Sequence, residues 1–222
     1  MPFKFSKIEF NGDPNIGLYG FATNDYCVLG IDPRKKILEQ IKKTLKADIK
    51  VSTITGTQLI GLFASGNSNG IVLTKIIENY ELNKLKKLFG INLEVIKPRE
   101  TALGNLILCN DNGCIISKSL FKYKKAISDA LGCEVVVGKV ANVDIVGSVA
   151  IASNVGCLCH REATKQEMEK IEKLLKVKVD VGTVGYGSPF IKSGLIVNSK
   201  GALYSEGTTG AELGRISEVF GE

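Results

Sequence analysis

The sequence predicts an α/β fold of five-fold pseudosymmetry, a propeller in which five ββαβ-type units surround one axis with their helices outside. Three observations predict it. An asparagine followed by an apolar run recurs five times, amphipathic segments recur with the same period, and a short strand-like run follows each of the first four amphipathic segments. Internal repeats of this length are typical of propellers and other repeat architectures.

The repeated asparagine marks a turn. The intervals between successive copies are 43, 43, 44 and 44 residues, at Asn24, Asn67, Asn110, Asn154 and Asn198. A glycine follows two or three residues later in four of the five copies. Because Asn and Gly tolerate positive φ, each copy is predicted to be the turn of a β-hairpin.

Apolar residues at helical spacing predict one helix in each unit. The predicted helices cover residues 37–45, 82–88, 123–131, 168–174 and 213–219. The first is expected to begin at Pro33, because proline suits the first helical position. The fourth and fifth are expected to begin with capping boxes, Thr164 with Glu167 and Thr209 with Glu212.

Short alternating runs such as residues 91–95 and 177–181 predict the last strand of each unit. The fifth helix has no such run after it, whereas the alternating run at residues 3–10 has no helix before it. We therefore predict that strand 3–10 completes the fifth unit and closes the ring by pairing the N- and C-terminal units, which removes exposed sheet edges. The predicted organisation is one domain of five repeats, at about residues 16–59, 60–102, 103–145, 146–191 and 192–222.

Composition narrows the class of protein. The chain has 222 residues, of which 44% are hydrophobic and 23% are charged, as in ordinary globular proteins. It contains no apolar run of the length that spans a bilayer and no signal-peptide pattern, so we expect no membrane partner and a cytoplasmic location. The net charge of +6 fits either an RNA partner or a lysine-rich solvated surface, and charge alone does not decide between them.

The strongest candidate for a metal site is the segment Cys157-Leu-Cys159-His160, which contains two of the six cysteines and the single histidine. No second Cys/His pair lies at zinc-site spacing elsewhere in the sequence. Other cysteines also follow a predicted turn, where small buried apolar residues are expected. We therefore predict buried, reduced thiols and neither a metal nor a cofactor.

Four segments, at residues 16–31, 101–113, 146–160 and 181–198, resemble the translation initiation factor 6 family, and the chain looks like an archaeal member of it. The resemblance implies the pentein fold, a five-unit α/β propeller. It also implies a monomeric, non-enzymatic factor that binds the large ribosomal subunit at its intersubunit face. There it would contact ribosomal proteins and adjacent ribosomal RNA, sterically prevent association with the small subunit in translation initiation, and have a place in large-subunit maturation.

The ribosome-facing loops of that family match Asn67 and Ser68 in the second unit and Gly104 and Asn105 in the third. We expect the docking face to consist of loops at one end of the ring, because loops on a rigid scaffold usually carry function. Asn105 is the strongest single candidate, since an amide side chain both donates and accepts hydrogen bonds. The alternative for Asn105 is a purely structural role in capping a turn.

An enzyme that modifies a guanidino compound is the alternative function, because other pentein proteins have such activity with a nucleophilic cysteine near the C-terminus. Here no cysteine follows Cys159, and the fifth unit contains Ser205 and Thr208 instead. Cys159 and His160 are neighbours on a predicted strand, so their side chains point to opposite faces. The sequence therefore predicts no catalytic residues.

Overall fold

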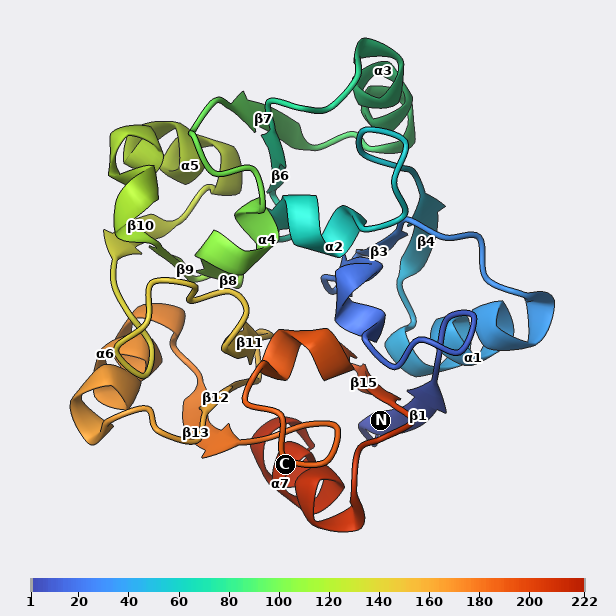
Figure 1. Cartoon of the computed structure of the whole chain (residues 1–222), viewed down its shortest axis with the longest axis vertical. Coiled ribbons are helices and arrows are strands. Elements are labelled where there is room, and N and C mark those ends of the chain that lie inside the picture. Colours follow the sequence, from blue (N-terminus) through green and yellow to red (C-terminus); the bar gives the residue numbers. More distant parts are fainter. Residues whose placement is uncertain (1, 222) are drawn as a thin grey trace.

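Five three-stranded sheets surround a central axis in the computed structural model, which describes residues 2–221 (Figure 1). In the first four sheets an antiparallel hairpin is followed by a third strand, which pairs parallel to the second strand of the hairpin. These sheets are β2-β3-β4 (Gly20–Ala22, Tyr26–Leu29, Asp48–Val51), β5-β6-β7 (Ala64–Gly66, Gly70–Thr74, Asn92–Ile96), β8-β9-β10 (Ile107–Cys109, Gly113–Ile116, Glu134–Val137) and β11-β12-β13 (Ala150–Ala152, Gly156–His160, Lys178–Gly182).

The fifth sheet joins the two ends of the chain. Its hairpin is β14 (Leu195–Val197) with β15 (Gly201–Ser205), and its third strand is β1 (Lys4–Ile8), which pairs parallel to β15 along its whole length. This pairing confirms the predicted closure and the five-fold α/β propeller. The predicted end of the fifth unit at residue 222 lies outside the described residues.

Five helices lie on the outside of the ring, one beside each sheet (Figure 1): α1 (Lys35–Leu45), α3 (Asn79–Leu88), α5 (Lys124–Leu131), α6 (Lys165–Leu175) and α7 (Gly210–Phe220). The predicted helices and both predicted capping boxes are confirmed. The first helix begins two residues after Pro33, because Arg34 keeps an extended backbone with ψ 146°.

Short helical turns line one end of the ring near the axis: η1 (Ile16–Leu18), α2 (Ile60–Phe63), α4 (Leu103–Leu106) and η3 (Ile191–Gly194). A further turn, η2 (Lys118–Tyr123), precedes α5. The hydrophobic core lies between the sheets and the outer helices. Its clusters combine residues of neighbouring units. In one of them, Leu29 and Leu45 of the first unit pack with Ile196 and Leu203 of the fifth sheet.

The hairpin turns correct the predicted alignment of the repeat. The equivalent first residues of the five turns are Thr23, Asn67, Asn110, Ser153 and Asn198, since each lies three residues before the next strand begins. Asn24 and Asn154 are one position later, so they do not align with the other asparagines. Their side-chain oxygens accept from the backbone amides of Ser199 and Asp111, at 3.0 Å in each case, across the gap to the neighbouring turn.

The asparagine at the first turn position links its unit to the next one. The Asn198 side chain donates to the Thr23 carbonyl at 2.9 Å and to the Leu45 carbonyl at 2.8 Å, and its oxygen accepts from the amides of Lys200 and Gly201. Asn67 and Asn110 make the four equivalent bonds, two to the next unit and two within their own turn. The repeated asparagine therefore does mark hairpin turns, and its side chain also holds adjacent units together.

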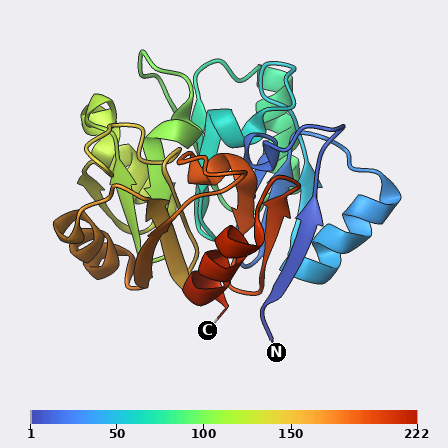
Figure 2. The same cartoon turned by 60° about the horizontal axis from the view of Figure 1, so that its bottom comes forward.

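The ring has two different ends (Figure 2). The turn face is formed by the hairpin turns at residues 23–25, 67–69, 110–112, 153–155 and 198–200, and the described part of the chain begins and ends there. The loop face is formed by the short helical turns and by the loops that follow the third strands, at residues 9–15, 52–59, 97–102, 138–148 and 183–190. No helix within residues 2–221 combines the length and the apolar character needed to cross a membrane.

Candidate functional site

The four candidate residues lie at opposite ends of the ring. Asn67 and Ser68 belong to the turn face, whereas Gly104 and Asn105 belong to α4 on the loop face. Strand β8 runs from α4 to the turn at residues 110–112, and its length separates the two ends. The structure therefore does not bring the four residues together on one surface.

Asn67 and Ser68 have structural contacts inside the ring. The Asn67 side chain is only 2% exposed and donates to the carbonyls of Asn110 and Leu131, at 3.1 and 2.9 Å. The Ser68 hydroxyl and amide both donate to the Asp111 carboxylate, at 2.9 and 2.8 Å. These bonds join the second unit to the third, so the polar groups of the pair are already used.

Asn105 has the opposite character. Its backbone is fixed, since its amide donates to the Ala102 carbonyl at 3.0 Å and its carbonyl accepts from the Gly147 amide at 2.9 Å. Its side chain is half-buried and makes no hydrogen bond to any residue from 2 to 221. Asn105 thus does not cap a turn with its side chain, and its amide remains available to a partner.

Asn105 lies in a depression at the middle of the loop face, with a volume of about 330 Å³. Phe190, which is 48% exposed, gives the depression an apolar wall, and Leu18 and Ile145 add to it. The remaining lining residues are Asn15, Ser148, Ser188, Lys192 and Ser193, with no carboxylate among them. The depression therefore combines apolar surface with hydrogen-bonding groups, as the centres of protein interfaces do.

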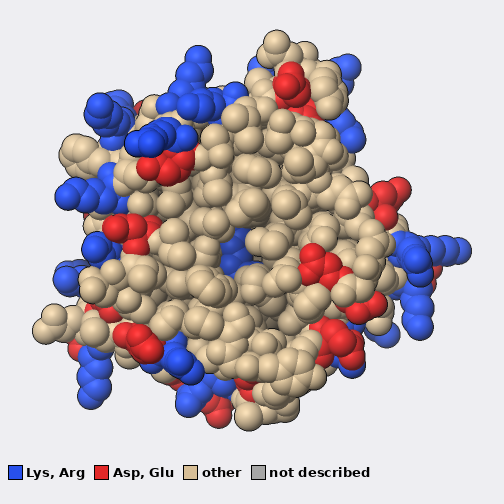
Figure 3. Space-filling view, viewed as in Figure 1, with Lys and Arg blue, Asp and Glu red and all other residues tan. Residues whose placement is uncertain are grey.

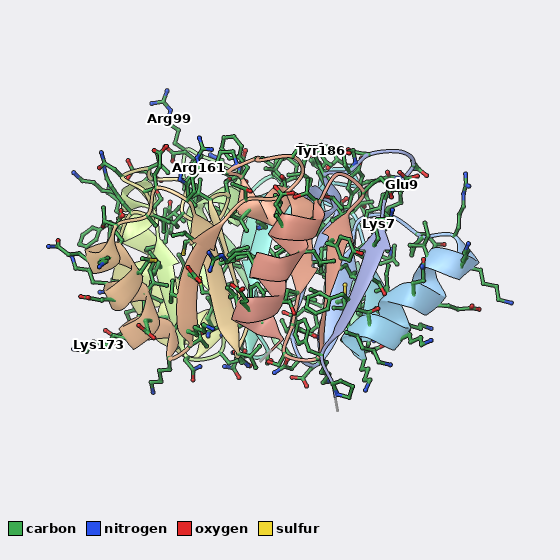
Figure 4. The ribbon with its side chains drawn as sticks, turned by 90° about the horizontal axis from the view of Figure 1, so that it is seen from below. Lys7, Glu9, Arg99, Arg161, Lys173 and Tyr186 are labelled. Atoms are coloured by element: carbon green, nitrogen blue, oxygen red, sulfur yellow. The ribbon has the colours of Figure 1, made fainter. Side chains whose placement is uncertain are left out.

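Charged side chains lie mainly around the rim of the loop face and seldom at its centre. Figure 3 shows acidic and basic side chains mostly toward the rim and few near the centre, apart from a small basic area at the axis. Figure 4 places Glu9, Arg99, Arg161 and Tyr186 at this end of the ring, with Lys173 at the other. Tyr186 is 82% exposed, the highest value among the large hydrophobic side chains of residues 2–221.

Carboxylates at the starts of three outer helices hold loops of this face in place. Glu81 accepts from the Thr53 hydroxyl and from the amides of Thr55 and Gly56, at 2.7 to 2.9 Å. Glu212 accepts from the Gly187 amide, and Glu167 from the Asn142 amide. Burial raises the pKa of each carboxyl, but the hydrogen bonds outweigh it and hold the pKa below its ordinary value.

Glycines allow the short helical turns to pack closely around the axis. A Cβ added to Gly17, Gly61, Gly104 or Gly147 would lie 1.8 to 2.3 Å from a carbonyl oxygen of the neighbouring turn. Such contacts are far inside van der Waals distance, so these positions require glycine. Lys192 occupies the equivalent position of the fifth turn. The other four turns have an apolar residue followed by glycine, whereas the fifth has Ile191 followed by Lys192.

Lys192 is the residue that the sequence interpretation missed. Its side chain is 9% exposed, and its ammonium donates to the Gly104 carbonyl at 2.8 Å. Burial lowers the pKa of Lys192 to about 8, against a smaller opposing effect of the Cys109 thiol. The signal that could have identified it was the break in the glycine repeat at the fifth unit.

In the segment that was the strongest candidate for a metal site, the two cysteines belong to the core and the histidine is half-buried. Cys157 and Cys159 are buried with their sulfur atoms 3.7 Å apart, and the Nδ1 atom of His160 accepts from the Glu162 amide at 3.0 Å. Within residues 2–221 there is no group of three His, Cys, Asp or Glu side chains that could hold a metal ion. Burial raises the pKa of the Cys27 thiol to about 12, as expected for an unreactive core thiol.

Comparison with known proteins gives one consistent family. A family model described as the eIF-6 family matches residues 5–219. The chain is 36% identical over 219 residues to translation initiation factor 6 of Sulfolobus acidocaldarius, covering 97% of this chain and 98% of that one. It is 39% identical to translation initiation factor 6 of Saccharolobus islandicus, covering 97% and 98%. Translation initiation factor 6 of Methanocaldococcus jannaschii is 37% identical, with 96% of each chain covered.

Among solved structures, the chain is similar to DDAH from Pseudomonas aeruginosa, a C249S mutant complexed with citrulline. The TM-score is 0.50 at 12% sequence identity, covering 80% of this chain and 71% of that one. A likeness at this identity concerns the fold alone, and it agrees with the pentein propeller.

Proposed function

Because this chain belongs to the eIF-6 family, we propose that it acts in translation initiation by binding the large ribosomal subunit at its intersubunit face. The bound protein would occupy the surface that the small subunit needs and so prevent the two from associating. The named relatives are translation initiation factors, which supports the general role. We extend the proposal to a cytoplasmic, monomeric, non-enzymatic factor that also has a place in large-subunit maturation.

We place the docking surface on the loop face, around Asn105. The observation that carries this choice is the half-buried Asn105 amide, which has a fixed backbone and no hydrogen-bond partner for its side chain within the described chain. It lies beside Phe190 in a depression without carboxylates, near the middle of the face, where charged side chains are few apart from a small basic area at the axis (Figure 3). An anchor of this kind at the centre of a contact contributes more to affinity than residues at the rim.

A steric mechanism requires affinity and bulk rather than a reactive group. A standard protein interface buries about 800 Å² on each partner, and one end of a five-unit ring supplies a surface of that order. The loops that form it are held by Glu81, Glu167 and Glu212, so little ordering free energy is needed on binding. The chain thus presents a preformed surface.

Ribosomal RNA is the proposed second contact. The basic side chains toward the rim of the loop face, among them Arg99 and Arg161, would lie beside any RNA next to the docked centre (Figure 4). Neutralising RNA phosphates releases counterions, so affinity should fall as salt rises. An affinity that does not change with salt would indicate protein contacts alone.

The alternative, an enzyme that modifies a guanidino compound, requires a pocket for its substrate. The cavity on the axis has a volume of only about 50 Å³, whereas pockets for small molecules usually reach about 300 to 1,000 Å³. The depression beside Asn105 is large enough, at about 330 Å³, but neither a cysteine nor a histidine lines it. Lys192 lies at the axial cavity with its ammonium, which would repel a guanidinium cation. These features favour the binding factor over the enzyme.

The test is co-sedimentation of the purified protein with separated archaeal ribosomal subunits, followed by a subunit-joining assay. We expect stoichiometric binding to the large subunit alone and loss of joined ribosomes. A lack of binding by the unmodified protein under joining conditions would overturn the proposed function.

Two variants locate the docking end. Asn105→Lys should weaken binding at least about tenfold, because it places a long charged side chain in the depression. Val155→Lys, at an exposed position of the turn face, should bind normally, and both variants should melt within a few degrees of the parent. The opposite result, with Val155→Lys impaired and Asn105→Lys normal, would move the docking surface to the turn face.

A further inference from the structure

The end of the axis at the loop face is ringed by four short helical turns and, in the fourth unit, by the turn at residues 146–148, and these five segments differ at one position. Four of them have glycine there, and the backbone contacts leave no room for a side chain. The fifth has Lys192, whose side chain extends across to the Gly104 carbonyl of the third unit. The repeat is thus broken by a single cation at the axis.

This cation has no carboxylate partner in the described chain, although the Cys109 thiol borders the same cavity and opposes the lowering of its pKa. The Lys192 side chain is only 9% exposed. It borders the cavity on the axis and the depression beside Asn105, and no carboxylate lines either of them. An ammonium group donates up to three hydrogen bonds, of which one goes to the Gly104 carbonyl. A buried charge left without a counter-charge is costly, so most buried charges in proteins are paired.

The space beside the ammonium suits a small ligand. Lys192 lines both the axial cavity of about 50 Å³ and the depression of about 330 Å³, so it lies between the interior and the loop face. A water molecule takes up about 30 Å³ in the liquid, and the axial cavity therefore accepts only a species of similar size. Apart from Lys192, its walls are mostly apolar strand residues, together with the Ser65 and Cys109 side chains.

We propose that Lys192 and the axial cavity form a binding site for one small monovalent anion, of the size of a halide or formate ion. The ammonium supplies the positive charge and a hydrogen-bond donor, and the apolar walls strengthen the attraction by lowering the local dielectric constant. The ligand enters from the loop face, where the depression reaches Lys192. Binding is a property of the free protein and does not depend on docking to a ribosomal subunit.

The site should discriminate by size and charge. Sulfate and phosphate are larger than the cavity and would carry a second charge with no cation to match it. Bromide, which resembles chloride in size and charge, should bind equally well. A group bound only to the native state raises the melting temperature with the logarithm of its concentration.

The experiment compares melting temperatures in sodium chloride, bromide and sulfate at equal ionic strength and pH 6.5, for the parent, Lys192→Met and Lys97→Met. Lys97 is an exposed lysine of a loop on the same face, and its variant serves as the control. Each tenfold increase in chloride or bromide above its dissociation constant should raise the melting temperature of the parent and the control by roughly 3 to 6 °C relative to sulfate. Lys192→Met should lose this increment, and an equal response in all three proteins would overturn the proposal.

A second measurement uses the parent protein alone, so the result does not depend on the folding of a variant. Crystals soaked in sodium bromide should show an anomalous scattering peak within hydrogen-bond distance of the Lys192 ammonium. The peak should weaken above pH 8, as the ammonium loses its proton. Its absence at molar bromide and pH 6.5 would show that water alone solvates Lys192 and would refute the anion site.

Discussion

Asn198 offers the most direct test of how the ring is closed. Its side chain joins the fifth unit to the first by donating to the carbonyls of Thr23 and Leu45, while its oxygen orders its own turn. It is 1% exposed, so water does not replace any bond that is lost. The perturbations are Asn198→Ala, which removes all four bonds, and Asn198→Thr, which should remove only two.

The chain itself supplies the reason for the second variant. Thr23 occupies the equivalent turn position in the first unit, and its hydroxyl accepts from the amides of Asp25 and Tyr26 at 3.2 Å. A threonine at position 198 should likewise keep the two accepted bonds and lose the two donated ones. With about 1 kcal/mol for each hydrogen bond, the free energy of unfolding should fall by about 4 kcal/mol in Asn198→Ala and by about 2 kcal/mol in Asn198→Thr.

The assay is urea denaturation of the three proteins, with thermal melting as a second measure. For a chain of this length 1 kcal/mol corresponds to about 2 to 4 °C, so the melting temperature should fall by roughly 8 to 16 °C in Asn198→Ala and half as much in Asn198→Thr. A loss below about 1 kcal/mol in Asn198→Ala would refute the assignment of the bonds to ring closure. Equal losses in the two variants would refute the division between donated and accepted bonds.

Three further predictions concern packing, pH and cooperativity. Gly104→Ala should lower the free energy of unfolding by about 1 to 3 kcal/mol, because its Cβ would lie 2.0 Å from the Gly61 carbonyl oxygen. Gly90→Ala is the control and should have little effect, since its Cβ would meet no atom within 4 Å. Equal effects of the two substitutions would contradict the close packing. Between pH 8 and 10.5, Lys192 loses its proton in the native protein before it does so in the unfolded chain. In sulfate buffer, the free energy of unfolding of the parent relative to Lys192→Met should therefore rise by about 3 kcal/mol across that range. A difference that stays constant with pH would contradict the lowered pKa of Lys192. We also propose that the five units form one domain, so urea unfolding followed by circular dichroism and by tyrosine fluorescence should give one coincident transition, and two separated transitions would show independent units.

Local pattern was enough to predict the elements of the fold. Helical spacing located α1, α3, α5, α6 and α7, and hydroxyl–glutamate pairs located the starts of α6 and α7, because these signals arise within one or two turns of chain. The closure between β1 and β15 followed from counting, since one strand lacked a helix and one helix lacked a strand. Alignment of the turns was wrong by one residue at Asn24 and Asn154, because asparagine favours either turn position and the choice depends on a neighbouring unit.

The number of units, their order, the closure of the ring and the family all follow from the amino-acid sequence alone. The sequence could not determine which candidate residues share a surface, because strand direction sends Asn67 to one end of the ring and Asn105 to the other. Nor could it distinguish an asparagine that joins units from one that is free to bind, since the partners of Asn67 are up to 64 residues away along the chain. The roles of Asn105 and Lys192 depend on tertiary packing, which brings five distant turns around one axis. Within residues 2–221 this packing leaves the Asn105 side chain without a hydrogen-bond partner and the buried Lys192 ammonium without a carboxylate.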